Sequence, residues 1–131
     1  MKQSPLDLAT TPVILVTATL VGPITSHNIQ LILDTGASYT MISPEILIRI
    51  GCDPSQTLYK KPITTASGVE YVPFLIVSSL KVWGVERKNV EVCAHSLPPN
   101  IPARGLLGLN FLRHFNVHLN FLDRNITILS R

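Results

Sequence analysis

The stretch Leu31-Ile32-Leu33-Asp34-Thr35-Gly36-Ala37-Ser38 decides how the rest of the sequence is interpreted. Three apolar residues lead directly into Asp34, and a carboxylate at the end of a buried strand is costly unless it has hydrogen-bonding partners or a chemical task. Gly36 lets the backbone turn sharply, and the small side chains of Ala37 and Ser38 leave the acid uncovered. Two interpretations follow: an Asx-type turn in which Asp34 accepts hydrogen bonds from nearby backbone N–H groups, or a reactive site.

The composition indicates one domain without a membrane segment. The chain has 131 residues, of which 46% are hydrophobic, but it contains no apolar run of about 18 residues, so the apolar excess is assigned to a core and a subunit interface. The net charge is +3, yet the basic residues are scattered and not interleaved with aromatic residues, which disfavours nucleic acid as a partner. No signal peptide is evident, so we expect a cytoplasmic location; whether Cys52 and Cys93 pair is left open.

Hydrophobic periodicity predicts an all-β fold with one or two short helices. Residues 1–11 are polar and aperiodic and are expected to be a flexible N-terminal arm, with the folded domain at 12–131. Ser43, Pro44 and Glu45 suit the first positions of a helix that ends at Gly51. The expected strands cover 13–21, 29–33, 57–65, 69–77, 80–82, 90–94, 106–108, 117–122 and 126–129, and a second short helix covers 110–115.

The predicted hairpin over 57–77 has a turn at Ala66-Ser67-Gly68. Pro62 and Pro73 cannot donate backbone hydrogen bonds, so its strands are expected at an edge or unpaired at those points. A hairpin with an exposed tip and interrupted pairing is a candidate mobile flap. On periodicity alone, an ordinary surface hairpin is the simpler interpretation.

A second motif lies at residues 105–112, which read Gly-Leu-Leu-Gly-Leu-Asn-Phe-Leu. It predicts a buried strand ending in Gly108 and then a short helix. The same order of strand, glycine and helix follows Leu31, which is a weak indication of two structurally related halves.

Together, residues 33–37 and 105–112 resemble the two motifs of the single-domain, retropepsin-like aspartic proteases of clan AA type. The resemblance covers nearly all of residues 12–130 and implies a retropepsin-like acid protease barrel that works as a two-fold homodimer. It also implies an extended peptide or unfolded protein as substrate.

The resemblance gives each motif residue an expected role. Asp34 would be catalytic, and Thr35 would form a hydrogen bond across the dimer axis. The remaining expected site residues are the active-site loop residues Gly36, Ala37 and Ser38, the substrate-binding flap Thr65, Ala66, Ser67 and Gly68, and the loop-supporting residues Leu106, Leu107 and Gly108.

Peptide hydrolysis by this route requires two carboxyl groups close together. Hydrolysis by carboxylate-activated water needs one ionised carboxylate and one protonated carboxyl, which two close acids provide by sharing a proton. Of the aspartates, Asp7 is in the arm, Asp53 follows a helix end and Asp123 is in a turn, so the second acid is expected to be Asp34 of another chain. We therefore predict a homodimeric aspartic endopeptidase.

Other chemistries have little support in the sequence. There is no Gly-x-Ser-x-Gly elbow and no phosphate-binding loop. His114 and His118 are four residues apart, but the predicted helix ends between them and no further ligand completes a cluster, so no metal and no cofactor is expected. The alternative function is a non-catalytic dimerisation or peptide-binding module with the same fold, which would have no need of the acid.

Overall fold

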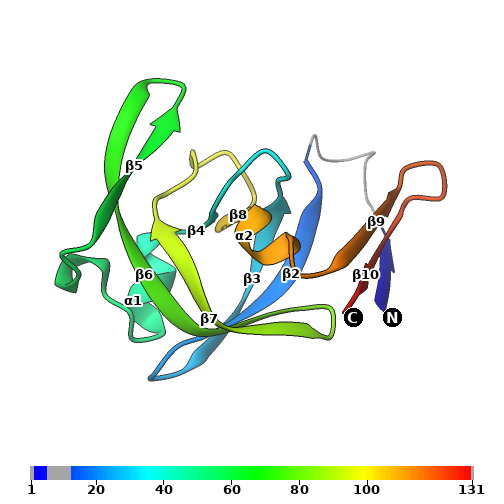
Figure 1. Ribbon diagram of the computed structural model, residues 1–131, viewed down its shortest axis with the longest axis horizontal. Helices are drawn as coiled ribbons and strands as arrows, with labels where there is room; N and C mark the ends of the chain where they lie inside the picture. The colour runs from blue at the N-terminus through cyan, green and yellow to red at the C-terminus, as the bar shows by residue number, and fades with distance from the viewer. Residues whose placement is uncertain (1, 6–12, 131) are drawn as a thin grey trace.

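The structure is a computed structural model that describes residues 2–5 and 13–130. It is built mainly of β-strands, as the sequence predicts, with short helices between them (Figure 1). The strands are β1 (Lys2–Pro5), β2 (Leu15–Val21), β3 (Ser26–Leu33), β4 (Thr40–Ile42), β5 (Lys60–Thr65), β6 (Gly68–Val82), β7 (Val85–Ala94), β8 (Gly105–Leu107), β9 (Asn116–Asn120) and β10 (Asn125–Leu129), and the helices are α1 (Pro44–Arg49), α2 (Leu109–Leu112) and the 3₁₀ turn η1 (Pro54–Gln56).

Six strands close into a barrel in the order β2-β3-β8-β4-β7-β6, and β6 pairs back with β2. The pairs β3–β8 and β4–β7 are parallel, and the other pairs around the barrel are antiparallel. Strand β5 extends this sheet as an edge strand on β6, and the β5–β6 hairpin stands away from the barrel at the upper left of Figure 1. The edge position predicted from Pro62 is confirmed for β5.

A separate three-stranded sheet, in the order β1-β10-β9, lies at the right of Figure 1. Residues 2–5, which the sequence assigns to a flexible arm, form β1 and pair with β10 in the register Lys2↔Ile128 to Pro5↔Asn125. Residues 1 and 6–11 of the predicted arm lie outside the described residues. In this part of the chain the two ends are brought side by side.

The core divides between the two faces of the barrel wall. Along β7, Val90, Val92 and Ala94 belong to the larger core cluster, to which α1, β2 and β3 also contribute buried side chains. Cys93 points the other way, into a smaller cluster with Met41, Val72 and Phe74. This alternation is the period of two that the sequence predicts for 90–94.

Two local features of α1 follow from its sequence. Pro44 occupies the first turn, and Gly51 ends the helix with φ +96°, a conformation that favours glycine. Ser43 has the extended backbone of an N-cap residue, but its side chain makes no capping hydrogen bond. The predicted helix start is therefore right, although the hydroxyl does not do the capping.

Strand β6 differs from the prediction, which placed separate strands at 69–77 and 80–82. It runs unbroken over 15 residues, because its first part pairs with β5 and its later part with both β7 and β2. Among the described residues, no helix is long and apolar enough to cross a membrane.

Candidate active site

Asp34 stands directly after β3, where the strand leaves the barrel wall. Leu31 and Leu33 are buried, whereas Asp34 is half-buried. The backbone N–H of Asp34 donates to the carbonyl oxygen of Leu107 at 3.1 Å, which extends the parallel β3–β8 ladder by one bond. The acid is therefore fixed by its backbone to the second motif.

The two carboxylate oxygens of Asp34 differ in their hydrogen bonding. The Gly36 N–H donates to Oδ1 at 2.9 Å, and the Ala37 N–H donates to the Asp34 carbonyl oxygen at 3.2 Å. In the part of the chain that the structure describes, Oδ2 accepts no hydrogen bond. The loop is thus an Asx-type turn, as one interpretation of the sequence predicts, and it also leaves an oxygen available for chemistry. Thr35 and Ser38 are exposed beside it.

The second motif supports the underside of this loop. The N–H of Leu109 donates to the Ala37 carbonyl oxygen at 2.8 Å, and the N–H of Asn110 donates to the Ser38 carbonyl oxygen at 3.2 Å. A Cβ atom on Gly108 would lie 2.5 Å from the carbonyl oxygen of Tyr39, so glycine is required by the close approach. The structure thus brings Leu107, Gly108 and residues 34–38 together.

Two residues that sequence reasoning gave no role, Thr40 and Asn110, form the joint between the motifs. The Oδ1 atom of Asn110 accepts from the Thr40 N–H at 2.8 Å and from the Thr40 hydroxyl at 2.9 Å. Its Nδ2 donates to the Glu91 carbonyl oxygen at 2.7 Å, and the Gly108 N–H donates to the Thr40 hydroxyl at 3.2 Å. The sequence signal for this joint is that Asn110 is the one polar side chain in the motif at residues 105–112.

The predicted flap residues lie apart from the loop that holds Asp34. Thr65 and Gly68 face each other at the end of the hairpin, and the turn is closed by a hydrogen bond from the Thr65 hydroxyl to the Gly68 carbonyl oxygen at 3.1 Å. No hydrogen bond joins residues 65–68 to residues 34–38 within the described ranges. Gly68 has φ +122° and open space where a Cβ would stand.

A lysine connects the base of this hairpin to the barrel. The Lys61 ammonium lies 3.1 Å from Glu91 Oε1 and sits over the rings of Tyr39, Tyr59 and Phe74 at 4.8, 5.3 and 4.7 Å from their centroids. The hydrogen bond to Glu91 raises the pKa of Lys61 above its ordinary value. Cation–π contact and charge pairing both favour the ammonium in this position.

The other aspartates within the described residues have local tasks. Asp53 accepts hydrogen bonds from the Ser55 N–H and hydroxyl, and Asp123 accepts from the Asn120 side chain; Asp7 lies outside the described residues. Among residues 2–5 and 13–130, no three His, Cys, Asp or Glu residues are grouped so as to hold a metal ion. Cys52 and Cys93 are both free thiols.

Comparison with known proteins agrees with this geometry. A family model described as gag-polyprotein putative aspartyl protease matches residues 21–114, a range that includes both motifs. The fold is similar to the crystal structure of a retropepsin-like aspartic protease from Rickettsia conorii, with a TM-score of 0.74 over 98% of this chain and 90% of that chain, at 18% identity. No curated protein matches the chain. The predicted retropepsin-like fold is confirmed.

Proposed function

The chain belongs to the gag-polyprotein putative aspartyl protease family, and from this we propose that it is an endopeptidase in which two Asp34 carboxylates, one from each chain of a homodimer, activate water. The observation that carries the proposal is the setting of Asp34. Its backbone is fixed by Leu107, one carboxylate oxygen is held by the Gly36 N–H, and the other accepts no hydrogen bond from the part of the chain that the structure describes.

The reaction needs both carboxyl groups in different protonation states. Two carboxyls at short range share one proton, because both cannot ionise together. The ionised one takes a proton from water while the water oxygen attacks the peptide carbonyl carbon, and the protonated one donates a hydrogen bond to the carbonyl oxygen. Collapse of the tetrahedral intermediate transfers a proton to the amide nitrogen, breaks the C–N bond and restores the shared proton.

A homodimer supplies the second acid. The other described aspartates, Asp53 and Asp123, are engaged in local turns. A two-fold axis beside Asp34 would place the same loop of a second chain opposite the first. The exposed Thr35 is proposed to form a hydrogen bond across that axis and to brace the two loops, with Ala37 and Ser38 beside them.

An extended polypeptide is proposed as the substrate, covered by residues Thr65–Gly68. Backbone groups of Gly36 and of the hairpin would pair with the substrate backbone in the manner of an added β-strand. The hairpin offers the exposed apolar side chains of Val69 and Tyr71. The hairpin projects from the barrel (Figure 1).

The decisive experiment is incubation of the purified chain with an unfolded protein, with and without a transition-state-mimicking inhibitor of aspartic proteases. We expect cleavage by the wild type, none by Asp34→Asn, and unchanged cleavage by the matched control Asp123→Asn. The amide is isosteric with the acid but cannot share the proton. Undiminished turnover by Asp34→Asn would remove Asp34 from the mechanism, whereas absence of cleavage by the wild type would favour a peptide-binding module.

The homodimer is tested by dilution. Specific activity should fall as the chain is diluted, because a monomer holds half a site. Thr35→Ala should move this loss to higher protein concentration. Sedimentation at the same concentrations identifies the species present, and an active monomer would contradict the two-chain site.

A further inference from the structure

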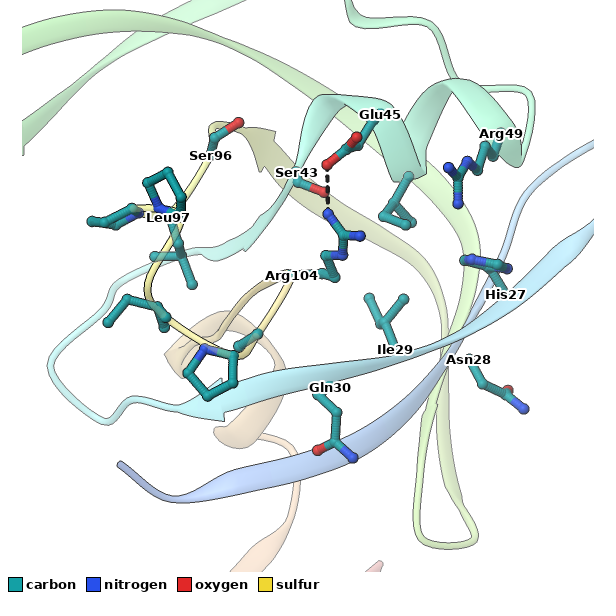
Figure 2. A pocket seen from close by; sticks show the side chains of 16 residues that line it. His27, Asn28, Ile29, Gln30, Ser43, Glu45, Arg49, Ser96, Leu97 and Arg104 are labelled. Atoms are coloured by element: carbon teal, nitrogen blue, oxygen red, sulfur yellow. Dashed lines mark hydrogen bonds and ion pairs between the residues drawn. The ribbon is translucent and has the colours of Figure 1, made fainter. Parts of the chain in front are cut away.

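A cavity apart from the surroundings of Asp34 lies between the start of β3, helix α1 and the loop 96–104. Its volume is about 690 Å³, within the range of small-molecule and peptide-side-chain sites. None of residues 34–38 or 65–68 lines it. Figure 2 shows the side chains that converge on it from these three elements.

The cavity has an apolar wall and a cationic wall. Much of the apolar wall comes from the loop 96–104, and Ile29 of β3 adds to it. The cationic wall carries Arg49 and Arg104, His27 lies beside them, and Glu45 is the acid that lines the cavity. With histidine neutral, these side chains leave one net positive charge. The apolar residues of the loop are Leu97, Pro98, Pro99, Ile101, Pro102 and Ala103.

Ser43 is the feature that most needs an explanation. It is 5% exposed, and its hydroxyl has no hydrogen-bond partner among residues 2–5 and 13–130, although its backbone N–H donates to the Arg104 carbonyl oxygen at 2.9 Å. Ser43 lines the cavity, and in the view of Figure 2 it is drawn close to the Glu45–Arg104 ion pair. An unsatisfied buried hydroxyl is destabilising, so a hydrogen-bond partner that enters from the cavity would stabilise Ser43.

The arginines have donors to spare. Arg104 Nη1 lies 2.6 Å from Glu45 Oε1, but this pair is half-exposed and one guanidinium carries five N–H donors. The Arg104 backbone is itself fixed, because its N–H donates to the Gln30 carbonyl oxygen at 2.9 Å. Arg49 forms no ion pair among the described residues. Guanidinium groups suit planar carboxylates, which they bind through paired hydrogen bonds.

We propose that this cavity binds a carboxylate carried on an apolar body. Arg104 and the Ser43 hydroxyl receive the carboxylate, Arg49 adds positive potential, and the apolar body lies against the proline-rich loop. A single negative charge matches the net charge of the walls, whereas the second charge of a dianion such as phosphate would be repelled by Glu45. The carboxylate can belong to a polypeptide or to a free small acid.

The test uses the full chain carrying Asp34→Asn, so that peptides are bound without being cut and the result is independent of catalysis. Titration calorimetry is run with 3-phenylpropionate, with a tetrapeptide that ends in leucine and a free carboxylate, and with the same peptide amidated. We expect saturable binding of the free acids and at least about tenfold weaker binding of the amide, since a charge-assisted hydrogen bond is worth more than about 1.4 kcal/mol. Binding of 3-phenylpropionate alone assigns the site to small acids, and binding of the peptide assigns it to polypeptides.

Variants locate the site. Arg104→Gln and Ser43→Ala should each weaken binding about tenfold, whereas Arg87→Gln, an exposed arginine of β7 outside the cavity, should not. Ser43→Ala is informative even if Arg104→Gln fails to fold, because removing an unpartnered hydroxyl should leave the melting temperature unchanged or raised. Binding that is absent for both free acids, equal for acid and amide, or unaffected by Ser43→Ala and Arg104→Gln would overturn the proposal.

Discussion

Replacing Asn110 by alanine tests whether the joint between the two motifs holds the Asp34 loop in place. The substitution removes three hydrogen bonds, two from the Thr40 N–H and hydroxyl and one to the Glu91 carbonyl oxygen. Thr40 is fully buried, so its donors lose their acceptor where water does not reach them. Each buried polar group left without a hydrogen bond costs about 1–3 kcal/mol, and the carbonyl of the half-exposed Glu91 falls at the low end of this range. We therefore expect the free energy of unfolding to fall by about 3–5 kcal/mol.

Urea unfolding followed by circular dichroism measures this loss, and peptide cleavage at a concentration where the variant is folded measures its effect on the site. Asn28→Ala is a matched control, because Asn28 is exposed and accepts one hydrogen bond, from the Thr19 hydroxyl; its cost should stay within about 0.5 kcal/mol. Thr40→Val should cost less than Asn110→Ala, and the double variant less than the sum, because both act on one network. A loss for Asn110→Ala no larger than that of the control would refute the reasoning.

Three further predictions concern Gly108 beneath the Asp34 loop, Gly68 at the tip of the proposed flap, and the two cysteines. Gly108→Ala should lower stability by about 1–3 kcal/mol in thermal unfolding, because its Cβ would stand 2.5 Å from the Tyr39 carbonyl oxygen; an unchanged melting temperature would show that the loop yields. Gly68→Val should slow turnover more than it lowers the melting temperature, since φ +122° resists a β-branched residue although space is open; a lower melting temperature with unchanged kinetics would mean an ordinary hairpin. Burial raises the pKa of Cys93 to about 11 and raises that of Cys52 above its ordinary value, so few thiolates exist at pH 8. Cys93 is 3% exposed and should react with maleimide only on unfolding, while Cys52 reacts in the native chain; mass spectrometry with and without urea checks the order.

Local sequence was sufficient to place Asp34. The apolar strand, the acid and the glycine lie within residues 31–36, so the turn around Asp34 depends on neighbouring residues and can be predicted from the sequence. The partner motif was recognisable for the same reason, because Leu107 and Gly108 are adjacent and their neighbours are apolar.

Contacts between distant residues could not be read in this way. Thr40 and Asn110 are 70 positions apart, and neither residue type by itself indicates a buried network. The grouping of Lys61 with Tyr39, Phe74 and Glu91 comes from four separate strands or loops. The continuity of β6 was also not predictable, because serines such as Ser78 and Ser79 are common in turns. In the structure, β6 continues through them because it pairs with β7 and, from Ser79, with β2.

The distance along the chain between the two motifs has a consequence for folding. Strand β3 can pair with β2 early, since residues 15–33 form a hairpin, but its parallel pairing with β8 and the Thr40–Asn110 bonds must close a loop of about 70 residues. Parallel, non-local pairing is slow, so the support beneath Asp34 is expected to assemble among the last parts of the fold. During synthesis, Asp34 leaves the ribosome long before residues 107–110 can hold it, so under the proposed function the nascent chain carries this acid without the support that peptide cleavage would need.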